Sequence, residues 1–229
     1  MKKLRPFLFI IVVLVIVIAL FAAAVVMPKP LAQAKSNAMD EIAELITVGD
    51  YSKAIEKLDK YEGKYGADDK SNYNRALSLS NLGKNDEARR YLYSCSSFFG
   101  EHNAEYRYLL GELDRKAGNL IGASYDYLDA LKINPDHYES LFRLGQYYYE
   151  NSSDCYDAIH YLRAAVVVYD QDPASLFLLG KAYLNIADYE DAKYFIDRAC
   201  EFSYAGVIKA EAEECYKIIA EHEEKGGLR

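Results

Sequence analysis

A short phrase that ends on alanine recurs along this chain at nearly constant spacing. It reads GDYSKA from Gly49, and related phrases follow as GKNDEA, GNLIGA, SDCYDA and ADYEDA. The closing residues are Ala54, Ala88, Ala123, Ala158 and Ala192, so the steps between them are 34, 35, 35 and 34 residues. A period of this length is typical of one supersecondary unit stacked on copies of itself. The sequence therefore predicts a solenoid, whose core is continuous across its repeats.

Apolar residues follow each alanine at helical spacing. Four residues later stand Leu58, Leu92, Tyr127, Leu162 and Ile196, and three residues beyond these stand Tyr61, Cys95, Ala130, Ala165 and Ala199. Spacings of four and seven place all three positions on one face of a helix. We therefore expect the second helix of every repeat to be regular.

An earlier helix is predicted in each repeat. A small residue stands twelve positions before the alanine at Ala76, Gly111 and Gly180. Between the two helices stand Gly49, Gly83 and Gly118. Glycine commonly ends a helix in the left-handed conformation, so each unit is expected to be a helical hairpin.

These residues resemble the tetratricopeptide repeat (TPR) pattern. That family has an apolar-plus-small pair in the first helix, alanines around a large residue in the second, and a proline near the end. The chain matches it with Leu110-Gly111, Tyr127 and Pro135, and again with Leu179-Gly180 and Ile196. The resemblance implies five hairpins over 35–206, namely 35–68, 69–103, 104–137, 138–172 and 173–206. The first two are looser, because Ile42 and Arg75-Ala76 replace the usual pair.

A last helix is predicted over 207–224 to cover the end of the array. An unstacked repeat exposes its core, so solenoids need such a cap. The apolar residues expected to face the last repeat are Val207, Ile208, Cys215, Ile218 and Ile219. The tail 225–229 has no periodicity and is expected to fray.

An apolar segment precedes the repeats. Residues 1–6 include Lys2, Lys3 and Arg5, and Phe7 to Met27 contain no charged side chain. Twenty-one helical residues span about 31 Å, close to the thickness of a bilayer core. The sequence predicts a single transmembrane signal-anchor helix over 7–27, which contacts the lipid bilayer, with a stiff linker over 28–34. The cations before the span place the N-terminus in the cytoplasm and the repeats outside it, as in a bacterial membrane protein.

A cleaved signal peptide is the alternative interpretation. The Ala32-Gln33-Ala34 stretch resembles a cleavage site, and cleavage there would give a secreted protein. The apolar run is longer than the usual ~7–15 residues, and the site lies beyond Pro28 and Pro30. These two features favour the uncleaved anchor.

The charge of the chain restricts its partners. The formal net charge is −8, and 24 basic residues stand against 35 acidic ones after residue 6. An acidic surface disfavours nucleic acid.

Neither catalysis nor a cofactor is indicated. No Gly-rich phosphate loop, nucleophile elbow or H-E-x-x-H pattern is present, so we expect no enzyme. His102 and His137 are 35 residues apart but lack further clustered ligands, and no metal site is predicted. Of the four cysteines, Cys200 and Cys215 stand on adjacent predicted helices and are a candidate disulfide.

Aromatic residues mark the candidate binding face. In TPR arrays the first helices line a concave groove, and the resemblance places the fifth repeat position in it. That position holds Tyr73, Tyr108, Phe142 and Phe177. Neighbouring groove positions carry Glu112, Arg115, Gln146, Tyr149, Lys181 and Asn185. The alternative is that these rings only pack between adjacent first helices.

The sequence thus predicts an all-α TPR scaffold that is anchored in a membrane and binds a protein or peptide in its groove without catalysis. Aromatic rings suit such a partner because they offer contact area at low entropic cost. A second hypothesis is an extracytoplasmic sensor module that recognises a cell-wall glycan or peptide through the same rings.

Overall fold

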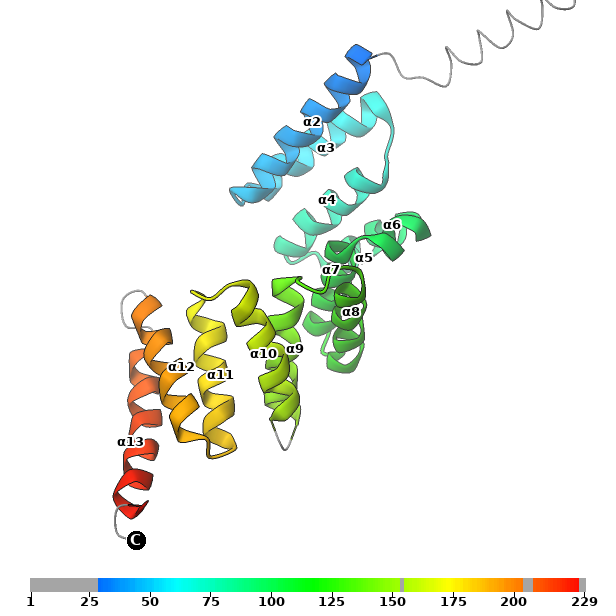
Figure 1. Ribbon diagram of the computed structural model, residues 1–229. Coiled ribbons are helices and arrows are strands. Elements are labelled where there is room, and N and C mark those ends of the chain that lie inside the picture. The colour runs from blue at the N-terminus through cyan, green and yellow to red at the C-terminus, as the bar shows by residue number, and fades with distance from the viewer. Residues whose placement is uncertain (1–28, 153–154, 204–207, 227–229) are drawn as a thin grey trace, which may run out of the picture. The chain divides into compact units, whose positions relative to one another are not determined.

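The protein is all-helical over the residues that the structure describes. The computed structural model describes 29–152, 155–203 and 208–226, and these residues contain twelve helices and no strand (Figure 1). The helices are α2 (Lys29–Thr47), α3 (Tyr51–Tyr65), α4 (Asp69–Asn81), α5 (Asn85–Tyr93), α6 (Ser97–His102), α7 (Ala104–Lys116), α8 (Leu120–Ile133), α9 (Tyr138–Asn151), α10 (Tyr156–Val168), α11 (Pro173–Asn185), α12 (Tyr189–Phe202) and α13 (Lys209–Gly226). The predicted all-α solenoid of hairpins is confirmed.

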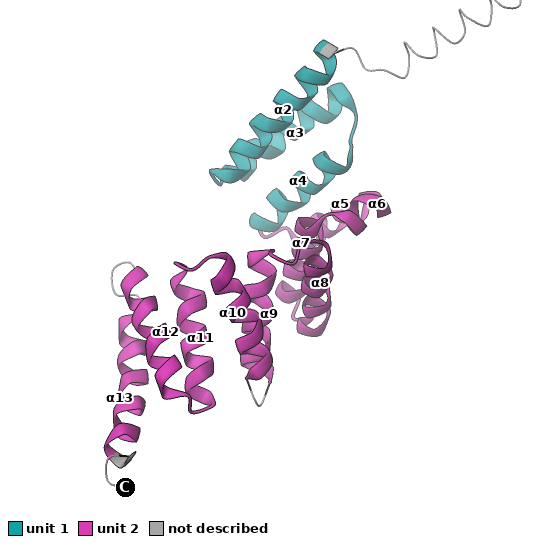
Figure 2. Ribbon diagram, in the orientation of Figure 1, with its two compact units in different colours: residues 1–82 teal, residues 83–229 magenta. Residues whose placement is uncertain are grey.

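The chain divides into two compact units, residues 1–82 and 83–229 (Figure 2). The division falls inside the predicted repeat 69–103, because α4 belongs to unit 1 whereas α5 and α6 belong to unit 2. The first repeat thus lies wholly in unit 1, and the last three lie wholly in unit 2.

Unit 1 is the α2–α3 hairpin with α4 packed on it. Its core is formed by Met39 and Ile42 of α2 with Leu58 and Tyr61 of α3. Helix α2 begins at Lys29, so residues 29–34, predicted as a linker, are helical. Pro30 permits this because the first turn of a helix has no intrahelical partner for its backbone N–H groups.

Unit 2 contains the three hairpins α7–α8, α9–α10 and α11–α12. Each first helix has a glycine at the point where a large side chain of its partner helix arrives. A Cβ atom on Gly111 would lie 2.5 Å from Tyr127, one on Gly145 2.5 Å from Leu162, and one on Gly180 2.7 Å from Ile196. A small residue of one helix against a large side chain of the other therefore sets how closely the two helices approach.

Left-handed residues join the helices of the hairpins. Gly49, Gly83 and Gly118 have φ values of 80°, 77° and 80°, as the sequence predicted. Ala187 takes the same conformation with φ 59°, without the freedom of glycine. The next residue, Asp188, caps α12 by accepting a hydrogen bond from the Asp191 N–H at 3.3 Å.

The second helix of repeat 69–103 is shorter than predicted. Helix α5 has 9 residues, whereas α8 and α12 have 14 each. It ends at Tyr93, before the run Ser94-Cys95-Ser96-Ser97, and Ser96 then caps α6 by accepting from the Phe99 N–H at 3.2 Å. Serine side chains compete for backbone hydrogen bonds and favour caps over helix interiors. Cys95 therefore lies outside α5, and the expected regularity of every second helix was wrong here.

Helix α13 caps the array and packs against α12 and α11. Its buried residues are Ala212, Cys215 and Ile219, which share one helical face. Ile218, predicted to face the last repeat, is 50% exposed because it is turned away from that face. Val207 lies outside the described residues. The helix continues to Gly226, two residues into the tail that was expected to fray, and 227–229 are not described.

No helix within 29–152, 155–203 and 208–226 is both long enough and apolar enough to cross a membrane. The span predicted over 7–27 lies outside these residues.

Candidate functional site

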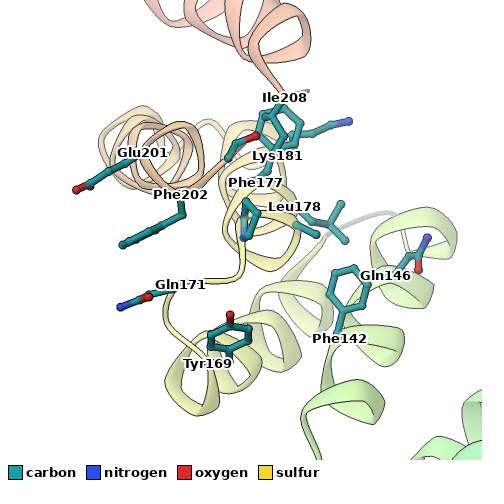
Figure 3. Close-up of a pocket in the computed structure, with 13 residues that line it drawn as sticks. Phe142, Gln146, Tyr169, Gln171, Phe177, Leu178, Lys181, Glu201, Phe202 and Ile208 are labelled. Carbon is teal, nitrogen blue, oxygen red and sulfur yellow. The ribbon is translucent and has the colours of Figure 1, made fainter. Parts of the chain in front are cut away.

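An aromatic pocket of about 920 Å³ opens in unit 2 between α9, α11 and the end of α12 (Figure 3). Helix α9 contributes Phe142 and Gln146, and α11 contributes Phe177, Leu178 and Lys181 among others. The remaining wall comes from the turn between α10 and α11, the end of α12 and the residue before α13. Those residues are Tyr169, Gln171, Glu201, Phe202, Ser203 and Ile208. The volume lies within the range of about 300–1,000 Å³ that small-molecule pockets occupy.

The rings of the pocket are held by packing. Phe177 is 8% exposed and belongs to the core of the last two repeats. Phe142 is half-buried and stacks on Tyr138, with ring centres 6.4 Å apart and planes 11° apart. The hydroxyl groups of Tyr138 and Ser175 lie 2.9 Å apart, which ties the start of α9 to α11. The aromatic walls are therefore set by contacts that do not depend on a bound molecule.

The charged groups of the pocket have different surroundings. The Lys181 ammonium lies 5.6 Å from the ring centre of Phe177 and 5.8 Å from that of Tyr149. It forms an ion pair with Glu211 of α13 at 3.4 Å. Glu201 is exposed at the end of α12 and forms no ion pair within the described part of the chain. Lys181 is thus neutralised locally, and the Glu201 carboxylate is open to a ligand.

Five of the ten predicted groove residues gather at this pocket. Phe142, Gln146, Phe177 and Lys181 line it, and Tyr149 adjoins it through Lys181. The amide of Gln146 is already engaged, since its Oε1 accepts from Arg143 at 3.1 Å and its Nε2 donates to Glu150 at 3.0 Å. Among these residues, Phe142 and Phe177 pack in or against the core and also line the pocket.

Glu112 and Arg115 form an internal network with Arg143 and Tyr127. The Glu112 carboxylate accepts from Tyr127 Oη at 2.7 Å, from Arg115 at 2.9 Å and from Arg143 at 2.9 Å. Burial alone would raise the pKa of Glu112, but the hydrogen bonds from Arg115 and Tyr127 and the arginine charges lower it. This network links α7, α8 and α9. The Glu112 carboxylate is therefore engaged within unit 2, whereas the Arg115 side chain is still 37% exposed.

The other predicted groove residues lie elsewhere. Tyr108 packs against Tyr127 and His137 at 5.8 and 5.4 Å, and burial raises its pKa to about 12. Asn185 is exposed and donates to Cys155 Sγ at 3.6 Å. Tyr73 is half-buried in unit 1. The four aromatic residues of the fifth position thus differ in surroundings, and only Phe142 and Phe177 line the pocket.

Several pocket residues were not predicted from the sequence. Tyr169, Gln171, Phe202 and Ile208 come from turns and helix ends, whereas the predicted groove consisted of first helices alone. Tyr169 is 52% exposed, and Val167 near it is 84% exposed. The sequence did contain one signal for this wall. Apolar residues such as Val167 and Tyr169 stand at the end of the second helix of repeat 138–172, where the repeat pattern requires only small residues.

The cysteines and His137 do not form the sites considered from sequence. All four cysteines are free, so the candidate disulfide between Cys200 and Cys215 is not formed. His137 is buried, and its Nδ1 accepts from the Ser140 N–H at 3.2 Å. Its Nε2 lies 3.2 Å from a Glu105 oxygen, an ion-pair distance without the alignment of a hydrogen bond. No group of three or more metal-binding side chains occurs in the described ranges.

Comparison with known proteins supports the fold. No family model matches the sequence, and no curated protein matches it. Among solved structures, PilF of Pseudomonas aeruginosa is 13% identical, with a TM-score of 0.67 over 83% of this chain and 89% of that one. The TPR protein TTC0263 of Thermus thermophilus is 17% identical, with a TM-score of 0.58 over 80% and 98%. YrrB, described as a TPR protein with an unusual peptide-binding site, is 16% identical, with a TM-score of 0.57 over 77% and 90%. The chain therefore has the fold of TPR proteins.

Proposed function

We propose that this chain is a scaffold that binds a segment of another protein in the aromatic pocket of unit 2. The observation that carries the proposal is the pocket itself, with Phe142, Phe177 and Phe202 around about 920 Å³. Apolar walls with a few polar groups at the rim suit a peptide side chain, because burial supplies affinity and the rim supplies specificity. The description of YrrB as a peptide-binding TPR protein supports the same kind of ligand. The scaffold acts by binding, without turnover.

The proposal includes a membrane tether formed by residues 7–27. Its support is the sequence alone, namely twenty-one residues without charge that follow three cations. Deletion of residues 1–27 should move the protein from the membrane pellet to the supernatant after carbonate extraction. Protease added to spheroplasts should digest the repeats. A mature chain that begins at Lys35 would contradict the tether and favour secretion.

Blocking the pocket tests the binding function. Ala174 is exposed at the second position of α11 and lines the pocket, so Ala174→Trp should fill it while leaving the core intact. Ala220 is an exposed alanine of α13 that does not line the pocket, and Ala220→Trp is the matched control. Full-length variants expressed in the source cells would be cross-linked and purified, and their partners identified by mass spectrometry.

We expect partners of the wild-type chain to persist with Ala220→Trp and to disappear with Ala174→Trp. Circular dichroism of both variants checks that each remains folded. Equal capture by the two variants would contradict binding in this pocket. Pocket-dependent capture of a cell-wall glycan, without protein, would instead favour the sensor hypothesis.

A further inference from the structure

The rim of the aromatic pocket is rich in carboxylates. Glu201 lines the pocket, and Asp170 and Asp172 flank the lining residue Gln171 in the turn before α11. Glu211 of α13 lies 3.4 Å from the lining residue Lys181. Glu201 thus lines the pocket, and three further carboxylates belong to residues that neighbour or contact its lining.

The cations at this rim are already paired. Lys181 contacts Glu211, and Arg198 donates to the Asp170 carbonyl oxygen at 2.8 Å and lies 3.8 Å from its carboxylate. Arg143, which lies over the Phe142 ring, is held by Glu112 at 2.9 Å. Asp172 caps α11 through the Ser175 N–H, which leaves its negative charge in place. Two of the four carboxylates are thus paired with Lys181 and Arg198, whereas Glu201 and Asp172 form no ion pair in the described part of the chain.

Glu201 is the carboxylate best placed to meet a ligand. It extends with Phe202 from the end of α12 on one side of the pocket, and Phe142 and Gln146 of α9 lie on the other side (Figure 3). The described residues supply no cation to Glu201, whose side chain is exposed. A carboxylate beside aromatic rings suits a cation with an apolar stem, because the ring faces and the carboxylate both attract the charge.

We infer that the pocket recognises a peptide segment in which an apolar residue is adjacent to a lysine or arginine. The apolar side chain enters between Phe142, Phe177 and Phe202, and the cation lies against Glu201. The formal net charge of −8 favours the approach of such a basic segment over long range. This inference rests on the proposed function, since it specifies the ligand of the same pocket.

Selection from random peptides tests the inference and does not require that the partner be identified. The probe is an mRNA-displayed library of random decapeptides, selected against the full-length chain in lipid nanodiscs. The same selection is made with Glu201→Lys and with Glu221→Lys. Glu221 is an exposed glutamate of α13, so the second variant makes the same change in charge away from the pocket.

We expect peptides with an apolar residue next to lysine or arginine to be enriched by the wild-type chain and by Glu221→Lys. In fluorescence anisotropy, Glu201→Lys should weaken the binding of these peptides about fivefold, because an exposed attraction becomes a repulsion. The difference should shrink as salt is raised, since exposed charges are screened.

The outcomes separate this inference from the proposed function. Enriched peptides that are blocked by Ala174→Trp but carry no basic residue, or that bind Glu201→Lys as well as wild type, would overturn the preference for a cation. They would leave the pocket as a binding site. If no enriched peptide is blocked by Ala174→Trp, the proposed function itself fails. Circular dichroism of Glu201→Lys checks that a loss of binding is not a loss of fold.

Discussion

Helix pairs within the two units are joined by contacts of different chemistry. In unit 2, Gly111, Gly145 and Gly180 each receive a large side chain in a close apolar contact. In unit 1, α4 carries Arg75 beside Ala76, and the buried guanidinium contacts Asp59 and Glu62 of α3, each at 2.8 Å. The hairpins of unit 2 are therefore closed by apolar contacts, whereas in unit 1 a charged contact joins α3 to α4 of the next repeat, beside the apolar core of the α2–α3 hairpin. Adding one carbon atom at the apolar contact should therefore lower the stability of unit 2. Removing the carboxylates of the charged contact should lower the stability of unit 1.

The largest effect is expected from removing the carboxylates that face Arg75. The double variant Asp59→Ala/Glu62→Ala removes two carboxylates that each lie 2.8 Å from the guanidinium of Arg75, whose side chain is only 7% exposed. Removing a partner of a buried charge typically costs about 3–5 kcal/mol. Hydrogen exchange of α3 and α4 should report the loss, and α11 and α12 should be unaffected because stability in a solenoid is distributed over its repeats.

The control for this variant is Glu41→Ala, which removes an exposed ion pair with Lys57. Exposed pairs contribute little to stability, so the control should leave exchange in unit 1 unchanged. Equal exchange in the double variant and the control would show that Arg75 does not depend on its carboxylates.

The next largest effect is expected at Gly180 in unit 2. In Gly180→Ala the new methyl group would lie 2.7 Å from Ile196 Cγ1 and 3.1 Å from the Ala192 carbonyl oxygen. Overpacking of this kind costs about 1–3 kcal/mol. Chemical denaturation should show the loss, and exchange should place it in α11 and α12. Wild-type stability in this variant would contradict the close contact between the two helices.

Replacing Asp126 of α8 should change stability by a smaller amount and in the opposite direction, so that unit 2 becomes more stable. Burial and the neighbouring Asp114 raise its pKa to about 6, above the ~3.9 of an unfolded aspartate. Because the folded pKa is the higher one, ionisation destabilises the fold as pH rises from about 4 through 6. Asp126→Asn should therefore stabilise unit 2 by about 1–2 kcal/mol at neutral pH and have no such effect below pH ~4.

Asp68 of unit 1 provides the comparison for this pH dependence. Its burial would raise its pKa, but hydrogen bonds from Lys35, the Ser71 N–H and Tyr61 lower it. A lowered pKa stabilises the fold above the unfolded value of ~3.9, and this contribution is lost as pH falls through the folded value. Lowering the pH should thus remove the stabilising contribution of the Asp68 carboxylate and relieve the destabilising contribution of the Asp126 carboxylate. Parallel pH profiles for Asp68→Asn and Asp126→Asn would contradict this assignment.

The smallest effect is expected at Gly63 in α3. A Cβ atom there would meet nothing within 4 Å, and the residue is exposed. Alanine restricts the unfolded chain more than glycine, so Gly63→Ala should stabilise unit 1 by about 0.5–1 kcal/mol. The melting temperature should rise in this variant and fall in Gly180→Ala, two identical substitutions that differ only in their surroundings.

The sequence predicted the hairpins because their packing pattern repeats, and it did less well where local chemistry departs from the period. Ala88 stands at its expected position, yet α5 ends at Tyr93 because the serines beyond it favour a cap. The register of the helices is set by the alanines, whereas their lengths are set by the residues that follow.

The candidate site was predicted in part for a related reason. Phe142 and Phe177 could be found because groove positions recur with the repeat. Phe202 and Ile208 could not, because they come from the junction between the last repeat and the cap, which occurs once. The role of Glu112 was also hidden, since its partner Arg143 is 31 residues away. Such a contact joins two successive repeats. It depends on how the repeats stack, and the spacing of residues within one repeat does not show this.

The most direct test of binding in the pocket is site-specific photo-cross-linking of the full-length chain in intact cells. A photoreactive phenylalanine derivative would replace Ala174, which lines the pocket, or Ala220, an exposed residue outside it. The proposed function predicts a discrete protein adduct from position 174 and none from position 220. The same adducts from both positions, or none from position 174, would contradict it.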